Sequence, residues 1–197
     1  MITEILLGLV IGIVYVYLKG KKVAFIGMKG SGKTTAVHAF QAIEHKEQGW
    51  KADNDNPGTM GNDTYDDVLG FKVCIDTSGA QELKRNWEKT ISEVDWVFYF
   101  FDISRLDEIV KDENGDVRYR KLVKADLVDI AEICKRKNKK ILVIATHSDV
   151  QHDEKKAEQY CSDILQVLRD YEFVKGSLRD YNSACDLVNE ISKRLKK

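Results

Sequence analysis

Eight residues near the start of the chain have the types and the spacing of a loop that binds phosphate. Residues 27–34 read Gly-Met-Lys-Gly-Ser-Gly-Lys-Thr, which matches the pattern G-x-x-x-x-G-K-[ST]. The glycines let backbone N–H groups approach phosphate oxygens, the lysine can reach the β- and γ-phosphates, and the threonine hydroxyl can bind Mg²⁺. The pattern predicts a nucleoside triphosphate site with contacts from Lys29, Gly30, Ser31, Gly32, Lys33, Thr34 and Thr35.

Two aspartates farther along the chain follow apolar runs and extend this chemistry. Asp76 comes directly after the strand predicted at residues 71–75, which is apolar except for Lys72, and it opens the sequence Asp-Thr-Ser-Gly. It is therefore suited to holding Mg²⁺ through water, while the backbone N–H of Gly79 can approach the γ-phosphate. Asp149 comes four residues after the strand predicted at residues 140–145, which is apolar after Lys140. Its carboxylate can accept hydrogen bonds from the N1–H and N2 groups of guanine, a pair of donors that adenine lacks. The nucleotide expected is therefore a guanine nucleotide.

The elements that must carry these residues alternate between strands and helices. We expect strands at residues 23–26, 64–68, 71–75, 96–101, 140–145 and 173–174, and helices at residues 35–46, 83–93, 119–136, 153–171 and 183–195. Residues 50–63 and 112–116 are polar and predict loops. This alternation is typical of an α/β fold, a P-loop NTPase three-layer sandwich with a mainly parallel sheet. Ligands of such sheets bind at the carboxyl ends of the strands, where Gly27, Asp76 and Asp149 would meet.

Composition limits the class of protein. The 31 basic and 32 acidic residues give a formal net charge of −1, which offers no field to attract nucleic acid. A single proline and a hydrophobic content of 43% exclude a disordered chain. The four cysteines are scattered without a C-x-x-C pair, so we expect reduced, mostly buried thiols. Residues 21–197 are expected to form one domain.

Residues 2–18 form an apolar run that is interrupted only by Thr3 and Glu4. As a helix the run would be about 25 Å long, against a hydrocarbon core of about 30 Å. We expect an N-terminal membrane-anchor helix over residues 1–20. The lysines that follow it, at positions 19, 21 and 22, predict a single-pass protein whose domain faces the cytoplasm. The alternative is an extra buried strand or helix. Ile2 excludes N-myristoylation.

Taken together, these motifs resemble those of the Ras-type small GTPases, most closely the ADP-ribosylation factor branch. Residues 146–149, Thr-His-Ser-Asp, stand where the family has Asn-Lys-x-Asp, and residues 76–79 with Trp87 and Asp102 keep the spacing of the second switch region. Residues 56–61 resemble the first switch region, so the resemblance implies that Thr59 binds Mg²⁺, with Thr64 as the alternative. It also implies that the base lies against Thr146, His147, Asp149, Ser177 and Leu178, in loops 146–149 and 176–178, and that the cofactors are GTP or GDP and Mg²⁺.

The chain also departs from the family pattern. Thr146 and His147 replace the usual Asn and Lys, so the support of the phosphate loop should be altered. Ala80 stands where the family has a glutamine that orients water, and Gln81 is displaced by one position. No arginine is obviously placed to act within the chain. The catalytic candidates are Lys33, Thr59 and Gln81, and intrinsic hydrolysis is expected to be slow.

The function that we expect is a membrane-anchored, GTP-binding molecular switch with slow intrinsic hydrolysis. An N-terminal span that leads directly into such a domain is similar in architecture to the β subunit of the signal-recognition-particle receptor. One alternative is a GTP-binding scaffold or receptor subunit that does not hydrolyse the nucleotide. Another is an ATP-using P-loop kinase, which would need an acceptor site and an arginine-rich lid. A protein effector or partner subunit is implied but not identified.

Overall fold

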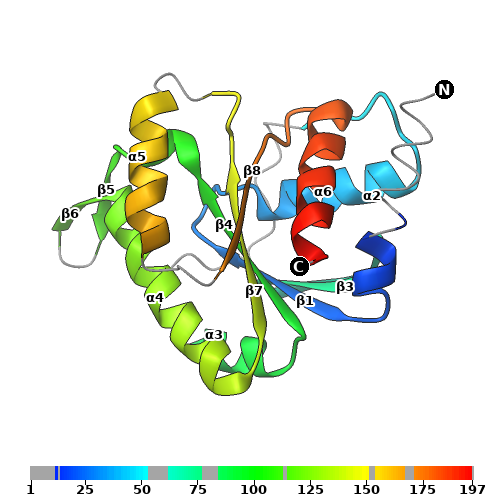
Figure 1. The fold of residues 1–197 in the computed structure, drawn as a ribbon, viewed down its shortest axis with the longest axis horizontal. Coiled ribbons are helices and arrows are strands. Elements are labelled where there is room, and N and C mark those ends of the chain that lie inside the picture. The colour runs from blue at the N-terminus through cyan, green and yellow to red at the C-terminus, as the bar shows by residue number, and fades with distance from the viewer. Residues whose placement is uncertain are drawn as a thin grey trace.

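A six-stranded sheet forms the centre of the fold, in the order β2-β3-β1-β4-β7-β8 (Figure 1). The computed structural model describes residue 12 and residues 14–52, 62–76, 84–112, 115–150, 154–166 and 171–196. Only β2 and β3 pair antiparallel, and all other neighbours in this sheet are parallel. The strands of the sheet are β1 (Lys22–Gly27), β2 (Asn62–Val68), β3 (Phe71–Asp76), β4 (Trp96–Asp102), β7 (Lys140–Thr146) and β8 (Glu172–Lys175).

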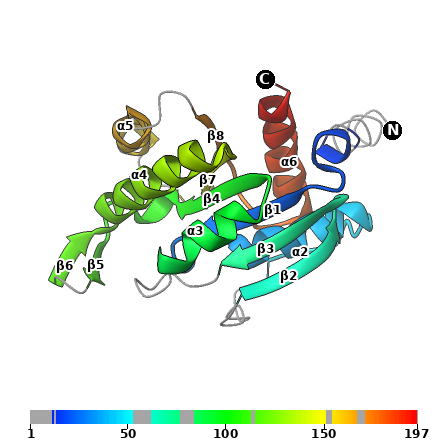
Figure 2. The ribbon, with the colours of Figure 1, turned by 90° about the horizontal axis from the view of Figure 1, so that it is seen from below.

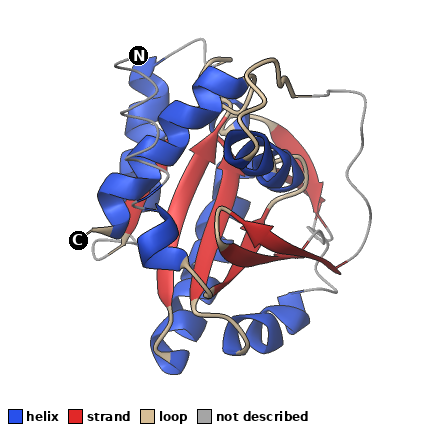
Figure 3. Cartoon of the chain, turned by 90° about the vertical axis from the view of Figure 1, so that its right-hand side faces the viewer, coloured by secondary structure: helices blue, strands red, loops and turns tan. Residues whose placement is uncertain are grey.

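Helices cover both faces of the sheet, which makes three layers (Figures 2 and 3). One face packs against α2 and α6, and the other against α3, α4 and α5. The helices are α2 (Lys33–Glu44), α3 (Lys84–Ser92), α4 (Tyr119–Lys137), α5 (Glu154–Leu165) and α6 (Tyr181–Leu195). The expected α/β fold with a mainly parallel sheet is confirmed.

Strand β4 shows why the sheet must be covered on both sides. Successive side chains of a strand point to opposite faces. Phe98 and Phe100 accordingly belong to the core under α2 and α6, while Tyr99 and Phe101 belong to the core under α3, α4 and α5. All four are fully buried. The continuous apolar run therefore produces a central strand with two buried faces, as expected for a parallel sheet.

The register brings the carboxyl ends of the strands to one edge. Gly27 pairs with Phe100 near the end of β4, and Asp102 pairs with Thr146 at the end of β7. The last residue of β3, Asp76, lies on the other side of β1, because Phe25 pairs with Ile75. The loops that leave β1, β4 and β7 therefore lie side by side.

The structure differs from three sequence-based predictions of local structure. Residues 112, 115 and 116, which the sequence places in an acidic loop, belong to the strands of a second, two-stranded sheet, β5 (Ile109–Asp112) and β6 (Gly115–Arg118), in which Gly115 has a positive φ of 104°. Helix α5 ends at Leu165 rather than at residue 171. Helix α6 begins at Tyr181, two residues early, because Oδ1 of Asp180 accepts a hydrogen bond from the Ser183 N–H and caps the helix.

The described part of the N-terminal segment packs against the domain. Residues 14–18 are helical, and Val14 and Leu18, four residues apart, lie in the core beneath α2 and α6. The Tyr15 ring lies directly over Gly70. A side chain at position 70 would collide with the ring, because its Cβ would stand 2.3 Å from a ring carbon. Tyr15, Val16 and Tyr17, which lie between Val14 and Leu18, are exposed, so only one side of this stretch is buried against the domain. None of the helices in the described ranges combines the length and the apolar composition that a membrane crossing requires.

Candidate functional site

The loop between β1 and α2 can only form with glycines at its ends. A Cβ on Gly27 would stand 2.0 Å from the carbonyl oxygen of Phe100, so the close approach of β4 excludes any other residue. Gly32 has a φ of 82° and is the N-cap of α2, with no side-chain hydrogen bond to the first turn. The backbone N–H groups at this helix N-terminus are thus suited to an anionic ligand.

Lys33 places a positive charge inside the loop. Its side chain is buried, and its Nζ donates hydrogen bonds to the carbonyl oxygens of Gly27 at 2.8 Å and Met28 at 2.9 Å. The side chain therefore curls back along the loop and holds the ammonium group against the backbone of the first two loop residues. This arrangement fits the phosphate contact that the sequence predicts for Lys33.

Thr146 ties the end of β7 to the phosphate loop. Its buried hydroxyl lies 3.0 Å from the carbonyl oxygen of Ser31 and 3.1 Å from that of Phe101, and both carbonyls are acceptors. A hydroxyl has one hydrogen, so it donates to one carbonyl at a time. The loop thus keeps a side-chain support although threonine replaces the family's asparagine. The sequence predicted that the support of the phosphate loop would be altered. In the structure the shorter side chain of Thr146 reaches the backbone of this loop at Ser31.

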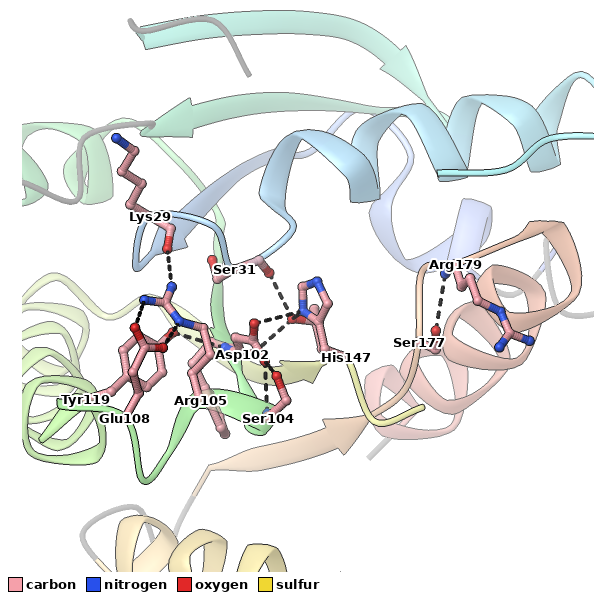
Figure 4. A network of polar contacts seen from close by, with 12 residues as sticks. Lys29, Ser31, Asp102, Ser104, Arg105, Glu108, Tyr119, His147, Ser177 and Arg179 are labelled. Atoms are coloured by element: carbon pink, nitrogen blue, oxygen red, sulfur yellow. Dashed lines mark hydrogen bonds and ion pairs between the residues drawn. The ribbon is translucent and has the colours of Figure 1, made fainter. Parts of the chain in front are cut away.

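His147 continues this polar network towards β4 (Figure 4). Its Nδ1 lies 2.9 Å from Oγ1 of Thr146 and 3.4 Å from Oδ2 of Asp102. The Asp102 carboxylate is itself buried and accepts hydrogen bonds at Oδ1 from the backbone N–H and the hydroxyl of Ser104. His147 has a φ of 58°, which is unusual for a residue other than glycine, and its contacts hold the backbone in that conformation.

The loops after β7 and β8 meet at the other end of the site. The N–H of Ser148 donates to the carbonyl of Gly176, and the side chain of Leu178 lies 3.4 Å from where a Cβ of Gly32 would stand. Ser177 Oγ accepts a hydrogen bond from the N–H of Arg179 at 3.1 Å. The base loops predicted from the sequence therefore adjoin the phosphate loop, although they follow it by more than a hundred residues.

Asp149 remains accessible at the mouth of these loops. Its side chain is 25% exposed, and the guanidinium Nη1 of Arg179, itself 69% exposed, lies 4.0 Å from Oδ2. Nε of Arg179 also bonds Asp180 at 3.3 Å. A pair this exposed contributes little to stability. The carboxylate can therefore exchange Arg179 for the donors of a base at small cost.

The structure brings most of the predicted site residues together. The phosphate-loop group, namely Lys29, Gly30, Ser31, Gly32, Lys33, Thr34 and Thr35, adjoins the base group, namely Thr146, His147, Asp149, Ser177 and Leu178. Thr59, Gly79 and Gln81 lie outside the described residues. Asp76 is the last residue of β3, and Thr64, the alternative to Thr59, lies in β2 with an exposed side chain.

The sequence analysis missed two arginines of the site. Arg179 directly follows Ser177 and Leu178, so a base loop placed one residue later would have included it. Arg105 lies at the end of the short helix η2 (Ile103–Arg105) and donates from Nη1 to the carbonyl of Lys29 at 3.2 Å. Its signal is weaker: Arg105 and Glu108 form an i,i+3 pair directly after a strand. Hydrogen bonds between the two raise the pKa of Arg105 and lower that of Glu108.

Two solved GTP-binding proteins share this fold. The chain is similar to the ADP-ribosylation factor-like GTP-binding protein SAR1, a small COPII coat GTPase, from Encephalitozoon cuniculi in complex with GDP, with a TM-score of 0.59, 13% identity, and coverage of 99% of this chain and 89% of that one. It is also similar to translation elongation factor SelB from Methanococcus maripaludis in complex with the GTP analogue GppNHp, with a TM-score of 0.58 and 18% identity. That match covers 91% of this chain and 34% of the elongation factor.

No protein-family model matches the chain, and no curated protein matches it either. At 13% and 18% identity the two structural matches show the fold. The resemblance to small GTPases that the motifs indicate is confirmed at that level. The fold is thus one that the chain shares with two solved proteins in complex with GDP or a GTP analogue.

Proposed function

We propose that the chain binds GTP and GDP at the carboxyl edge of its sheet and acts as a molecular switch with slow intrinsic hydrolysis. The observation that carries the proposal is the convergence of the phosphate loop, with the buried ammonium of Lys33, and the Asp149 loop at one edge. The two solved proteins of the same fold, bound to GDP and to a GTP analogue, support it.

The phosphates would be held by backbone N–H groups of residues 29–35 and by Lys33. The uncapped N-terminus of α2 and the glycines of the loop fit an anion, because they present donors without a side chain in the way. Mg²⁺ would be held by the hydroxyl of Thr34, by Thr59, and through water by Asp76; these are the oxygen ligands that this ion prefers. The metal would neutralise charge on the β- and γ-phosphates.

The base would be selected by Asp149. Its carboxylate accepts the N1–H and N2–H donors of guanine, and adenine offers no matching pair. Leu178 and the Gly32 end of the phosphate loop, which lie next to each other, would supply apolar surface for the base. These contacts favour GTP over ATP and therefore favour a GTP-binding switch over the ATP-using kinase.

Slow hydrolysis follows from Ala80, which has no group to orient water, while Gln81 is displaced by one position. The same residue favours the second candidate, a scaffold that binds GTP without cleaving it. Single-turnover hydrolysis with and without cell extract separates the two candidates. The switch would release phosphate in at least one of the two conditions, and the scaffold in neither. We further propose that residues 1–20 attach the domain to a membrane with the domain on the cytoplasmic side, on the strength of the apolar run and the lysines after it.

Titration of the purified full chain with fluorescent GDP, followed by competition with GTP, GDP and ATP, tests nucleotide binding. We expect GTP and GDP to compete and ATP to fail. Lys33→Ala should abolish binding, because it removes the cation from the centre of the loop. Preferential competition by ATP would refute the proposal.

A further inference from the structure

Arg105 is fastened on three sides beside the phosphate loop (Figure 4). Its Nε and Nη2 donate to the two carboxylate oxygens of Glu108, the second at 3.0 Å. Its guanidinium carbon lies 4.9 Å from the ring centroid of Tyr119. The remaining nitrogen, Nη1, donates to the carbonyl oxygen of Lys29 at 3.2 Å. One nitrogen of the guanidinium group thus points at the loop, while the other two are held by Glu108.

This hydrogen bond determines the direction of the next N–H group. The peptide between Lys29 and Gly30 is planar and trans, so its C=O and N–H point in opposite directions. Since the Lys29 carbonyl points at Arg105, the N–H of Gly30 points away from Arg105. Thr146 acts in the same way on the peptide between Ser31 and Gly32. It donates to the Ser31 carbonyl and so orients the N–H of Gly32.

Arg105 also brings positive charge close to the loop backbone. A Cβ on Gly30 would stand 3.4 Å from Nη1 of Arg105, so no side chain separates the guanidinium from this part of the loop. The charge is 31% exposed and only partly screened by solvent. A phosphate bound within the loop would therefore be attracted by Arg105 in addition to Lys33, although the paired carboxylate of Glu108 reduces this attraction.

We infer that Arg105 is a positioning residue of the phosphate loop, which aims the Gly30 N–H at the phosphates of the bound nucleotide and strengthens their binding. The inference rests on the proposed nucleotide binding. Without that role, Arg105 would only fasten η2 to Glu108 and Tyr119, and its replacement would change stability but not the affinity for nucleotide.

The test compares three variants of the full chain with wild type. Arg105→Ala removes both the hydrogen bond and the charge. Arg105→Lys keeps the charge but loses the fork that grips Glu108. Arg118→Ala is the matched control: it removes one cation from the adjacent β6, where Arg118 pairs with Asp107 and with no residue of the loop. The readouts are the dissociation rate of fluorescent GDP, the ¹H shift of the Gly30 amide in the GDP complex, and the thermal midpoint.

We expect Arg105→Ala to release GDP about tenfold faster or more, since a hydrogen bond to a charged group is lost. The Gly30 amide should move upfield, Arg105→Lys should recover part of the rate, and Arg118→Ala should match wild type. A wild-type rate and Gly30 shift in Arg105→Ala would overturn the inference. An equal acceleration in Arg118→Ala would do so too. If Arg105→Ala does not fold, a wild-type Gly30 shift and rate in Arg105→Lys would overturn it. Binding of guanine nucleotide to wild type is measured before any variant is compared. If wild type binds none, the proposed function itself fails.

Discussion

Replacing Thr146 by valine removes a single hydroxyl from the centre of the site and leaves its shape nearly unchanged. Two buried carbonyls, those of Ser31 and Phe101, share this hydroxyl at 3.0 and 3.1 Å. Since the hydroxyl has one hydrogen, one hydrogen bond to these carbonyls is lost, together with the 2.9 Å contact between Oγ1 and Nδ1 of His147. A buried acceptor left without its donor costs about 1–3 kcal/mol. We expect the free energy of unfolding to fall by about 1–3 kcal/mol, and GDP to dissociate faster because the Ser31–Gly32 peptide loses its support.

Urea unfolding of the nucleotide-free chain and the dissociation of fluorescent GDP measure the two effects. Thr146→Ser is the control, because it keeps the hydroxyl and loses only the γ-methyl group, which lies 3.6 Å from where a Cβ of Gly32 would stand. Its GDP dissociation should remain near wild type although its stability falls. Equal dissociation rates in wild type and Thr146→Val would refute the claim that Thr146 supports the loop. A Thr146→Ser variant that releases GDP as fast as Thr146→Val would locate the effect in the methyl group.

Three further outcomes are expected. Asp149→Asn should weaken GTP binding and favour xanthosine triphosphate, whose base presents an oxygen where guanine has its N2 amino group, as competition titration would show; unchanged GTP binding would exclude Asp149 from base recognition. Removing residues 1–18 should lower the unfolding free energy by about 1.5–3 kcal/mol through the loss of the buried Leu18 alone, and more than removing residues 1–11, as measured in urea. Burial raises the pKa of Cys134 from 9.0 to about 12, so its contribution to stability is complete below pH 9.0 and is lost as the pH rises towards 12; urea midpoints on either side of pH 9.0, compared with Cys134→Ala, check this sign.

Some features of the site were predictable because they depend on residues that are close together in the sequence. Gly27, Gly32 and Lys33 belong to one short loop, and the positive φ of Gly32 is a local reason for glycine. Gly27 is required for a tertiary reason, because β4 approaches it through the carbonyl of Phe100. The apolar run of β4 predicted a strand with two buried faces, since its period and length leave few alternatives. The β5–β6 hairpin was missed because its strands have only four residues each, of which two are charged, so that neither shows an alternating apolar pattern.

The supports of the loop were decided by tertiary structure alone. Thr146 and Ser31 are 115 residues apart, and Arg105 and Lys29 are 76 apart. Their contacts depend on β4 lying between β1 and β7, an order that no local pattern specifies. The sequence by itself determined that a phosphate loop follows a buried strand. Which side chains orient its N–H groups was settled only when the carboxyl ends of three parallel strands met at one edge, because hydrogen bonds act over about 3 Å in space and not along the chain.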